Sequence, residues 1–167
     1  MVSVEEYLRS SYEGGAEYVD GEVFERNWGE RSHSEVQGEL LLFLHIRRAE
    51  LRLFVLASLT LQVSATRFRI PDVCAYLEEP NEEIPRTPPF LCIEVLSPED
   101  RWIRFHEKID DYLNFGVPYI WVVNPWSRRA GTYNTEGSRE VKDGALRTEN
   151  PSLTVALPEI FAAIDAK

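Results

Sequence analysis

The chain has 167 residues, of which 44% are hydrophobic and 28% charged, and its formal net charge is −10. This length predicts a single domain, residues 1–167, that is large enough to bury a hydrophobic core. No run of about 18 uncharged apolar residues is present to form a transmembrane helix. The first residues, MVSVEEYLRSSYEGG, lack the apolar core of an export signal. We therefore expect a cytoplasmic protein with no membrane partner.

The negative charge argues against a general nucleic-acid binder, because such binding depends on neutralising phosphates. It does not exclude an enzyme that reaches a phosphodiester through a metal ion and a local basic patch. The basic side chains are fifteen arginines and only three lysines, so a lysine beside acidic residues stands out. Cys74 and Cys92 lie in apolar runs, which is typical of reduced, buried thiols in a cytosolic protein.

The start of the chain predicts a short helix and a hairpin. Residues 2–10 have an amphipathic pattern that favours a short helix. EYVDGEVFE, residues 17–25, reads as two short strands around Asp20-Gly21, a pair typical of two-residue hairpin turns.

A long buried helix is expected next, followed by two strands. Residues 32–50 show the apolar spacing of a helix, and Ser32 with Glu35 three residues later resembles a capping box. Residues 54–64 and 67–77 have the apolar and β-branched composition of strands.

The centre of the chain predicts a β-α-β unit. FLCIEVLS, residues 90–97, reads as a strand, and the SPED sequence at 97–100 is typical of a helix start, with Ser as the N-cap and Pro at the first helical position. That helix is expected to end near Phe115. YIWVVNP, residues 119–125, reads as a second strand, which should run parallel to the first because a helix connects them.

The remaining chain predicts short strands at 130–134, 139–141 and 145–147, and the closing PEIFAAI predicts a short helix. All these elements together predict a mixed α/β (α+β) fold. Its centre would be a sheet of antiparallel and parallel strands that is covered by two main helices.

Two carboxylates are expected at strand ends. Pro71 lacks an N–H, so Asp72 enters its strand from a kink and can present its carboxylate at the rim of a sheet. Strand alternation places Glu94 on one face with Cys92 and Leu96. A carboxylate in such an apolar strand is rarely buried unless something pairs with it or binds to it.

Lys108 lies at the edge of the apolar stripe of the helix that follows, one turn from Tyr112. Its aliphatic part can lie on the sheet while the ammonium reaches the end of a strand. Each of the three residues also has an ordinary interpretation. Asp72 would be a turn-forming acid, Glu94 an acid paired with arginine, and Lys108 a lysine at a helix boundary.

Considered together, Asp72, Glu94 and Lys108 predict a hydrolytic site. Mg²⁺ (or Mn²⁺) prefers oxygen ligands, usually one or two carboxylates with water and substrate phosphate. The two carboxylates and the backbone carbonyl of Val95 can supply the protein ligands. The metal would lower the pKa of a bound water, and Lys108 would orient that water or stabilise developing negative charge. Phosphodiester hydrolysis fits this layout.

PD at 71–72, IEVLSPED at 93–100, EK at 107–108 and DYLNFGVPYIWVVNP at 111–125 resemble the Uma-type family of restriction-endonuclease-like proteins, which is assigned to the PD-(D/E)xK nuclease superfamily. YVDGEVFE near the start, the helix from His33 and the closing PEIF extend the resemblance over most of the chain. The resemblance implies a restriction-endonuclease-like fold, in which a mixed sheet is flanked by helices. It also implies Mg²⁺-dependent cleavage of nucleic acid.

Carried over by position, Asp72 matches the aspartate of the superfamily motif and Glu94 its glutamate. The superfamily's usual lysine would stand at position 96, where this chain has Leu96. The Uma-type pattern places the lysine on the following helix instead, which corresponds to Lys108.

Superfamily members often add an acidic or polar residue from the first helix, and His33 and Glu35 are the candidates here. Glu22 in the hairpin is a further nearby carboxylate. The chain departs from the family at Arg104 and Asn124, where the family often has aspartate.

The leading hypothesis is a Mg²⁺-dependent endonuclease that acts on DNA and, as a duplex cutter with one site per chain, forms a homodimer. One alternative is a catalytically silent interaction or dimerisation module of the same fold, which the acidic composition favours. Another is a metal-dependent hydrolase of a small phosphoester. Carboxylates that lie close enough to share a cation, with the lysine beside them, would favour an enzyme. An arginine bound across both acids would favour the silent module, and a narrow pocket the small substrate.

Overall fold

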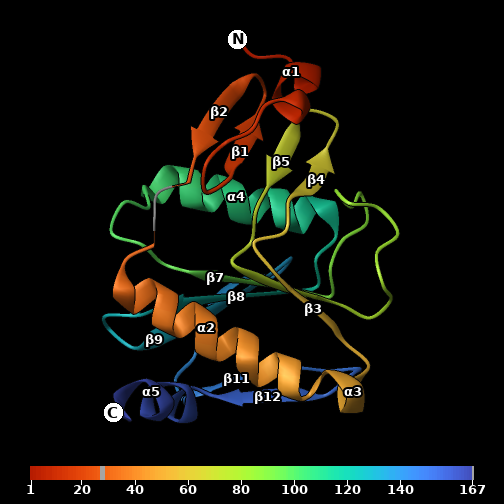
Figure 1. Ribbon diagram of the computed structural model, residues 1–167. Helices are drawn as coiled ribbons and strands as arrows, with labels where there is room; N and C mark the ends of the chain where they lie inside the picture. Colours follow the sequence, from red (N-terminus) through yellow and green to blue (C-terminus); the bar gives the residue numbers. More distant parts are fainter. Residues whose placement is uncertain (27–28, 167) are drawn as a thin grey trace.

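The computed structural model describes residues 1–26 and 29–166, and Figure 1 shows how they are layered around a central sheet. The helices are α1 (Val4–Arg9), α2 (Arg31–Ile46), α3 (Arg48–Leu51), α4 (Trp102–Phe115) and α5 (Leu157–Asp165). The first strands are β1 (Ala16–Val19), β2 (Glu22–Glu25), β3 (Phe54–Ala57), β4 (Leu61–Ser64), β5 (Arg67–Arg69) and β6 (Val73–Tyr76). The later strands are β7 (Leu91–Val95), β8 (Tyr119–Asn124), β9 (Arg129–Asn134), β10 (Gly137–Glu140), β11 (Ala145–Thr148) and β12 (Leu153–Ala156).

The central sheet has the strand order β10-β9-β8-β7-β6-β3 within the described residues. β7 and β8 run parallel, with α4 between them in the chain, and the other neighbouring strands pair antiparallel. This is the predicted β-α-β unit in the predicted mixed sheet, so the predicted fold class is confirmed.

Helix α4 lies between two sheets. A smaller N-terminal sheet, with the order β2-β1-β5-β4, lies on the far side of α4 from the central sheet (Figure 1). Helix α2 covers the opposite face of the central sheet, and the β11–β12 hairpin and α5 lie beyond α2 in the same view. Because α4 is enclosed in this way, any polar residue on it that points inward needs a partner from one of the two sheets.

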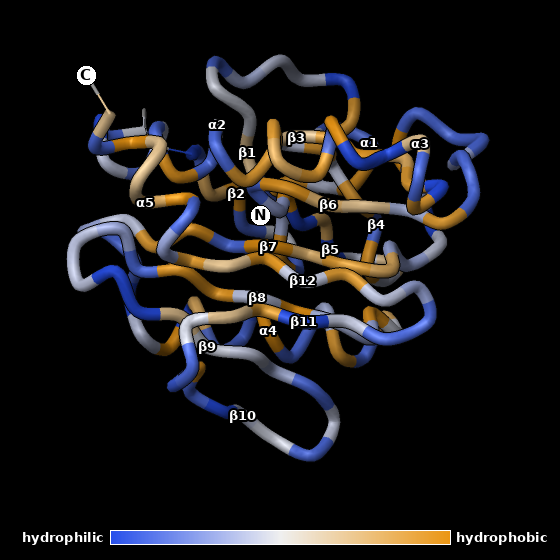
Figure 2. Tube along the Cα trace, turned by 90° about the horizontal axis from the view of Figure 1, so that it is seen from below, coloured by the Kyte–Doolittle hydropathy of each residue, from blue (hydrophilic) through white to orange (hydrophobic). Residues whose placement is uncertain are grey.

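Strand alternation divides the core into two halves. On the α2 face, Leu40 and Leu44 pack with Leu91 and Ile93 of β7. On the α4 face, a second cluster contains Ile109 and Tyr112 of α4 together with Cys74 and Cys92. Figure 2 shows β7 and β8 as hydrophobic strands inside the molecule and β10 as a polar strand at its rim.

The two cysteines lie opposite each other on β6 and β7, and both are buried and free, as the sequence predicted. The hairpin at Asp20-Gly21 is also confirmed, and both turn residues have positive φ angles. No helix within residues 1–26 and 29–166 is long and apolar enough to cross a membrane.

Two predicted long strands are each divided between the two sheets. Residues 54–64 form β3 of the central sheet and β4 of the N-terminal sheet, with a break that begins at Ser58, where φ is +51°. Residues 67–77 form β5 of the N-terminal sheet and β6 of the central sheet, and the break contains Pro71. Apolar composition alone does not distinguish one strand from two that change sheets. The hairpin formed by β11 and β12 extends the predicted strand at 145–147 and adds β12, which was not predicted.

The predicted helix starts are wrong in detail. Helix α2 begins at Arg31, so Ser32 is not its N-cap, and Glu35 binds Arg31 with 2.8 Å between Arg31 Nε and Glu35 Oε1. The capping box is therefore absent there, and the helix expected over 32–50 ends at Ile46 before the short α3. Helix α4 begins only at Trp102, because the SPED segment forms a turn in which the Ser97 N–H donates to the Asp100 carboxylate at 2.6 Å.

Leu40 and Leu42 on α2 test this assignment of the core. Leu40 is fully buried whereas Leu42 is 50% exposed. We expect Leu40→Ala to lower the free energy of unfolding by about 2–5 kcal/mol, because it removes buried methyl groups and leaves a cavity. Leu42→Ala on the same helix should change it by less than about 1 kcal/mol. Urea denaturation of both variants measures this, and equal losses would contradict the assigned face of α2.

Candidate active site

Asp72 and Glu94 face each other across two neighbouring strands. In the antiparallel pair of β6 and β7, Val73 lies opposite Ile93. Asp72 directly precedes Val73 and Glu94 directly follows Ile93, so the same register brings the two acids to facing positions. The Val95 N–H donates to Asp72 Oδ2 at 2.8 Å and fixes the aspartate against β7. Only 2% of Asp72 and 6% of Glu94 is exposed.

Asp72 is held by side chains from the hairpin and from α2. Arg26 Nη2 donates to Oδ1 at 2.7 Å, and His33 Nε2 lies 3.3 Å from Oδ2. Gln37 Nε2 donates to the Asp72 backbone carbonyl at 3.0 Å. Burial alone would raise the pKa of Asp72, but the hydrogen bond with His33 and the charge of Lys108 hold that pKa below its usual value. Asp72 is therefore a stable carboxylate.

Lys108 reaches from α4 to both sheets. Its Nζ lies 2.7 Å from Glu17 Oε1 of β1 and 2.9 Å from Glu94 Oε1 of β7. It also donates to the Ile70 carbonyl at 2.9 Å, between β5 and β6. Burial would lower the pKa of Lys108, but the charges of Glu17 and Glu94 outweigh burial and raise it. The side chain thus remains an ammonium ion and acts as a donor, not as a base.

Burial disfavours the charged form of Glu94 despite this lysine. The Tyr112 hydroxyl donates to its Oε1 at 2.6 Å, on the same oxygen that Lys108 contacts. Burial, with the added repulsion of Asp72 and Glu17, raises the pKa of Glu94 from 4.5 to about 7. An additional cation beside Glu94 would therefore be stabilised by its carboxylate.

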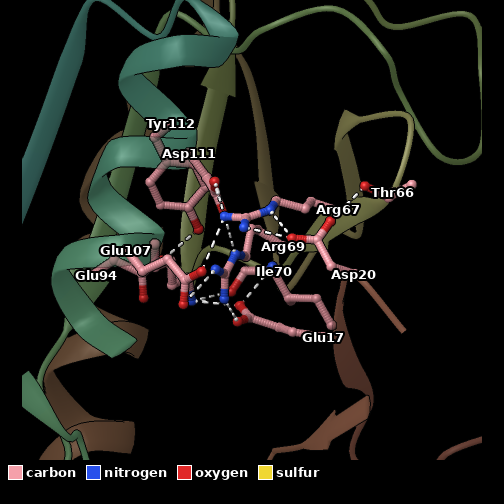
Figure 3. A network of polar contacts seen from close by, with 11 residues as sticks. Glu17, Asp20, Thr66, Arg67, Arg69, Ile70, Glu94, Glu107, Asp111 and Tyr112 are labelled. Atoms are coloured by element: carbon pink, nitrogen blue, oxygen red, sulfur yellow. Dashed lines mark hydrogen bonds and ion pairs between the residues drawn. The ribbon is translucent and has the colours of Figure 1, made fainter. Parts of the chain in front are cut away.

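Further charges continue from Glu17, the partner of Lys108, along the interface between α4 and the N-terminal sheet (Figure 3). Glu17 accepts from Arg69 Nη1 at 3.1 Å and from the Ile70 N–H at 2.9 Å. Arg69 Nε in turn donates to Asp111 at 2.6 Å, and Asp111 also binds Arg67 at 2.9 Å. Because these charges alternate in sign, each buried group has a partner, and Glu17 is held in place as the second carboxylate on Lys108.

Of the residues implied by the resemblance, His33 lies beside Asp72 whereas Glu35 and Glu22 lie elsewhere. Glu35 is bound to Arg31, and Glu22 is exposed on β2. Hydrogen bonding to Asp72 raises the pKa of His33.

Two site residues were not found from the sequence. Glu17 is a lone carboxylate in a buried strand with the sequence AEYV, the same pattern that singled out Glu94. Arg26 follows β2 and has no comparable signal, because only the folded chain brings it to Asp72.

The two departures from the family pattern have local partners. The Arg104 guanidinium lies over the Phe24 ring, 4.3 Å from its centroid. Asn124 Oδ1 accepts from the N–H groups of Trp126 and Ser127, both at 3.0 Å, and so shapes the turn after β8. Neither residue replaces one of the proposed metal ligands.

The donor set suits a hard divalent cation, although the site is not a complete metal cage. Among residues 1–26 and 29–166, no group of three or more His, Cys, Asp and Glu side chains is placed to hold a metal ion. Mg²⁺ commonly binds through one or two carboxylates, with water and phosphate as the other ligands. Asp72, Glu94 and the Val95 carbonyl offer oxygen atoms only, and burial raises the pKa of Glu94, so an added cation would stabilise its carboxylate form. Arg26 occupies Asp72 Oδ1 and is the group that a cation must displace.

The chain was compared with known proteins. The model of the Uma2 family, described as "Putative restriction endonuclease", matches residues 4–165. A crystal structure described as that of "a putative nuclease belonging to DUF820" from Anabaena variabilis is 18% identical to this chain, with a TM-score of 0.82 over 97% of this chain and 98% of that one. At this identity the similarity shows the fold alone. The comparison with curated proteins found no match.

The pH dependence of stability tests the charge state of Glu94. Folding raises the pKa of Glu94 from 4.5 to about 7, so the folded chain retains a proton that the unfolded chain releases. Stability must therefore fall as the pH rises through this range. His33, whose pKa is also raised, contributes in the same direction as the pH rises through its folded pKa.

We expect the metal-free protein to be less stable at pH 8 than at pH 6, with about 1 kcal/mol of the difference due to Glu94. Urea unfolding at both pH values measures the difference. In the variant Glu94→Gln this side chain cannot ionise, so only the part of the pH-dependent loss of stability that is due to His33 should remain. An unchanged slope in that variant would show that Glu94 titrates in its ordinary range.

Proposed function

From membership of the chain in the Uma2 family, together with the pairing of Asp72 and Glu94, we propose that this protein hydrolyses phosphodiester bonds in DNA with Mg²⁺ or Mn²⁺. One observation carries the proposal: a buried carboxylate just before β6 faces another on β7, with the Lys108 ammonium 2.9 Å from Glu94. Like charges at facing positions repel, and a shared cation relieves that repulsion.

Asp72, Glu94 and the Val95 carbonyl would hold the cation, on the side of the central sheet that faces α4. The bound cation would supply an activated water and neutralise charge on the phosphoryl oxygens. Asp72 is suited to this role because its low pKa keeps it ionised, and its bond from the Val95 N–H keeps it beside Glu94.

Lys108 would act on the substrate by donation. Its raised pKa excludes it as a general base near neutral pH, so it would stabilise negative charge on a phosphoryl oxygen or orient the attacking water. Its three N–H bonds have three partners: Glu17, Glu94 and the Ile70 carbonyl. A water or phosphoryl oxygen must replace one of them. Glu94 is the natural one to be released, because the cation would take over its charge.

A silent module is the second candidate, and the ion pair between Arg26 and Asp72 favours it. The guanidinium already neutralises Asp72 at 2.7 Å, so the acid has a partner without a cation. Among the described residues Arg26 forms its ion pair with Asp72 and none with Glu94, so this arginine does not bridge the two acids in the way that a permanent replacement for the cation would. A small-substrate hydrolase would need a narrow pocket here, whereas hydrogen-bonded side chains surround the two acids.

Nicking of supercoiled plasmid in the presence of Mg²⁺ or Mn²⁺ tests the nuclease proposal. Asp72→Asn and Lys108→Met should each reduce the rate at least about 100-fold, because one removes a cation ligand and the other a donor to the reacting phosphate. Asp110→Asn and Lys142→Met are matched controls, since both residues are exposed and outside the site. Equal activity in all four variants would contradict the assigned roles.

Arg26→Gln separates the enzyme from the silent module through cation binding alone. If Arg26 only competes with the cation for Asp72, its removal should tighten Mn²⁺ binding about tenfold, which corresponds to about 1.4 kcal/mol. Calorimetric titration of the metal-free protein measures this without any substrate. Failure of both the parent and Arg26→Gln to bind Mn²⁺ would favour the silent module.

A further inference from the structure

We propose that a second copy of this chain binds beside the free edge of the central sheet, around Leu77. In this dimer the acidic loop of each copy, residues 78–83, lies on the basic groove of the other. The basic groove is the hollow of about 620 Å³ at the junction of α2, α3 and β3. Neither Asp72, Glu94 nor Lys108 lines the surface involved, and the dimer does not require the proposed nuclease activity.

The basic groove has an apolar floor and a positive rim. Phe54 and Leu77 line it and are 40% and 43% exposed, which is unusual for large apolar side chains. His45, Arg48 and Arg52 line it as well, and all three are exposed. No acidic residue lines this hollow among the described residues, although the chain as a whole has a net charge of −10. An apolar centre with a charged rim is the usual composition of a protein interface.

An acidic hollow adjoins the basic groove and shares Leu77 with it. Glu78 and Glu79 follow Leu77 directly in the chain, are exposed and line this second hollow. Glu82 also lines it and pairs with Arg86 at 3.5 Å, so Glu78 and Glu79 are the better candidates for contact with another molecule. In Figure 1 the long yellow-green loop after β6 and the helix α3 lie on the same side of the molecule.

Two adjacent patches of opposite charge make this surface complementary to itself. In a dimer with two-fold symmetry, any contact from residue i to residue j is repeated from j to i. If the axis lies near Leu77, Arg48 and Arg52 of each copy face Glu78 and Glu79 of the other copy. The symmetry therefore forms this contact two times. The Phe54 and Leu77 side chains of both copies would then be covered at the centre. A partner with one sign of charge could match only one of the two patches.

The backbone supports use of this surface. β3 is an edge strand of the central sheet within the described chain, and its partner there is β6. Exposed sheet edges are ready sites for pairing with another chain. Arg52 ends α3 in the left-handed conformation, with φ +52° and ψ +51°, a position that usually favours glycine. Arg52 thus stands at a backbone position that does not favour a side chain.

A charge-exchange experiment tests the dimer. Sedimentation equilibrium of the parent chain should show a monomer–dimer equilibrium that weakens about tenfold between low and high salt, because the rim contacts are screened. The variant Arg48→Glu/Arg52→Glu should be monomeric, and so should Glu78→Arg/Glu79→Arg. An equimolar mixture of the two variants should dimerise again, since each arginine patch then meets a glutamate patch at both contacts.

The control is Arg139→Glu on β10, at the opposite edge of the same sheet, which should dimerise like the parent. Circular dichroism confirms that each variant is folded. If a charge-reversal variant does not fold, Arg48→Gln/Arg52→Gln and the salt dependence of the parent test the same contact.

A parent chain that stays monomeric up to about 1 mM overturns the proposal, because even weak association is populated there. The proposal is also overturned if both charge-reversal variants still dimerise, or if their equimolar mixture does not dimerise. None of these results depends on plasmid nicking.

Discussion

A buried ammonium group, that of Lys108, is the charge on which the arrangement of the site depends. Helix α4 is enclosed by two sheets, and Lys108 binds one carboxylate from each, Glu17 from the N-terminal sheet and Glu94 from the central sheet. A buried charge is tolerated only when it is paired and hydrogen-bonded. The lysine therefore ties the two sheets together through the helix between them. Loss of the ammonium would leave Glu17, Glu94 and Asp72 to repel one another in a site of low polarity.

Burial nevertheless leaves the Glu94 carboxylate incompletely stabilised. Lys108 pairs with Glu17 and Glu94, and Arg26 and His33 pair with Asp72. The pKa of Glu94 is nevertheless raised to about 7. Near neutral pH a part of the Glu94 side chains is therefore protonated, and a further cation beside Glu94 would favour the carboxylate form. The proposed divalent ion would bind Glu94 and Asp72 together and displace Arg26, so the proposed site would have partners for its acids both with and without metal.

The residue types and their order predicted Asp72, Glu94 and Lys108 as one candidate site, because Asp72 follows a proline, Glu94 interrupts an apolar strand and Lys108 lies at the edge of an apolar stripe, and the structure brings the three together. The parallel pairing of β7 and β8 also followed from the sequence, since a helix joins them. What the sequence did not reveal was the exchange of strands between sheets at Ser58 and Pro71. An apolar run has the same composition whether it stays in one sheet or crosses to another.

Glu17 and Arg26 were missed for a related reason. Their roles depend on contacts with residues at least 46 positions away in the chain, from Glu17 to Lys108 and from Arg26 to Asp72. The pattern around Glu17, a single acid in a buried strand, gives the one signal that could have been used. Arg26 lies beyond the end of a strand, where exposed arginines are common.

Anomalous diffraction from a crystal of this protein soaked in Mn²⁺ tests the central claim most directly. We expect one peak per chain between the carboxylates of Asp72 and Glu94, with the Arg26 guanidinium moved away from Asp72. A soaked crystal with no peak there, and with Arg26 still bound to Asp72, would show that the two acids do not form a cation site.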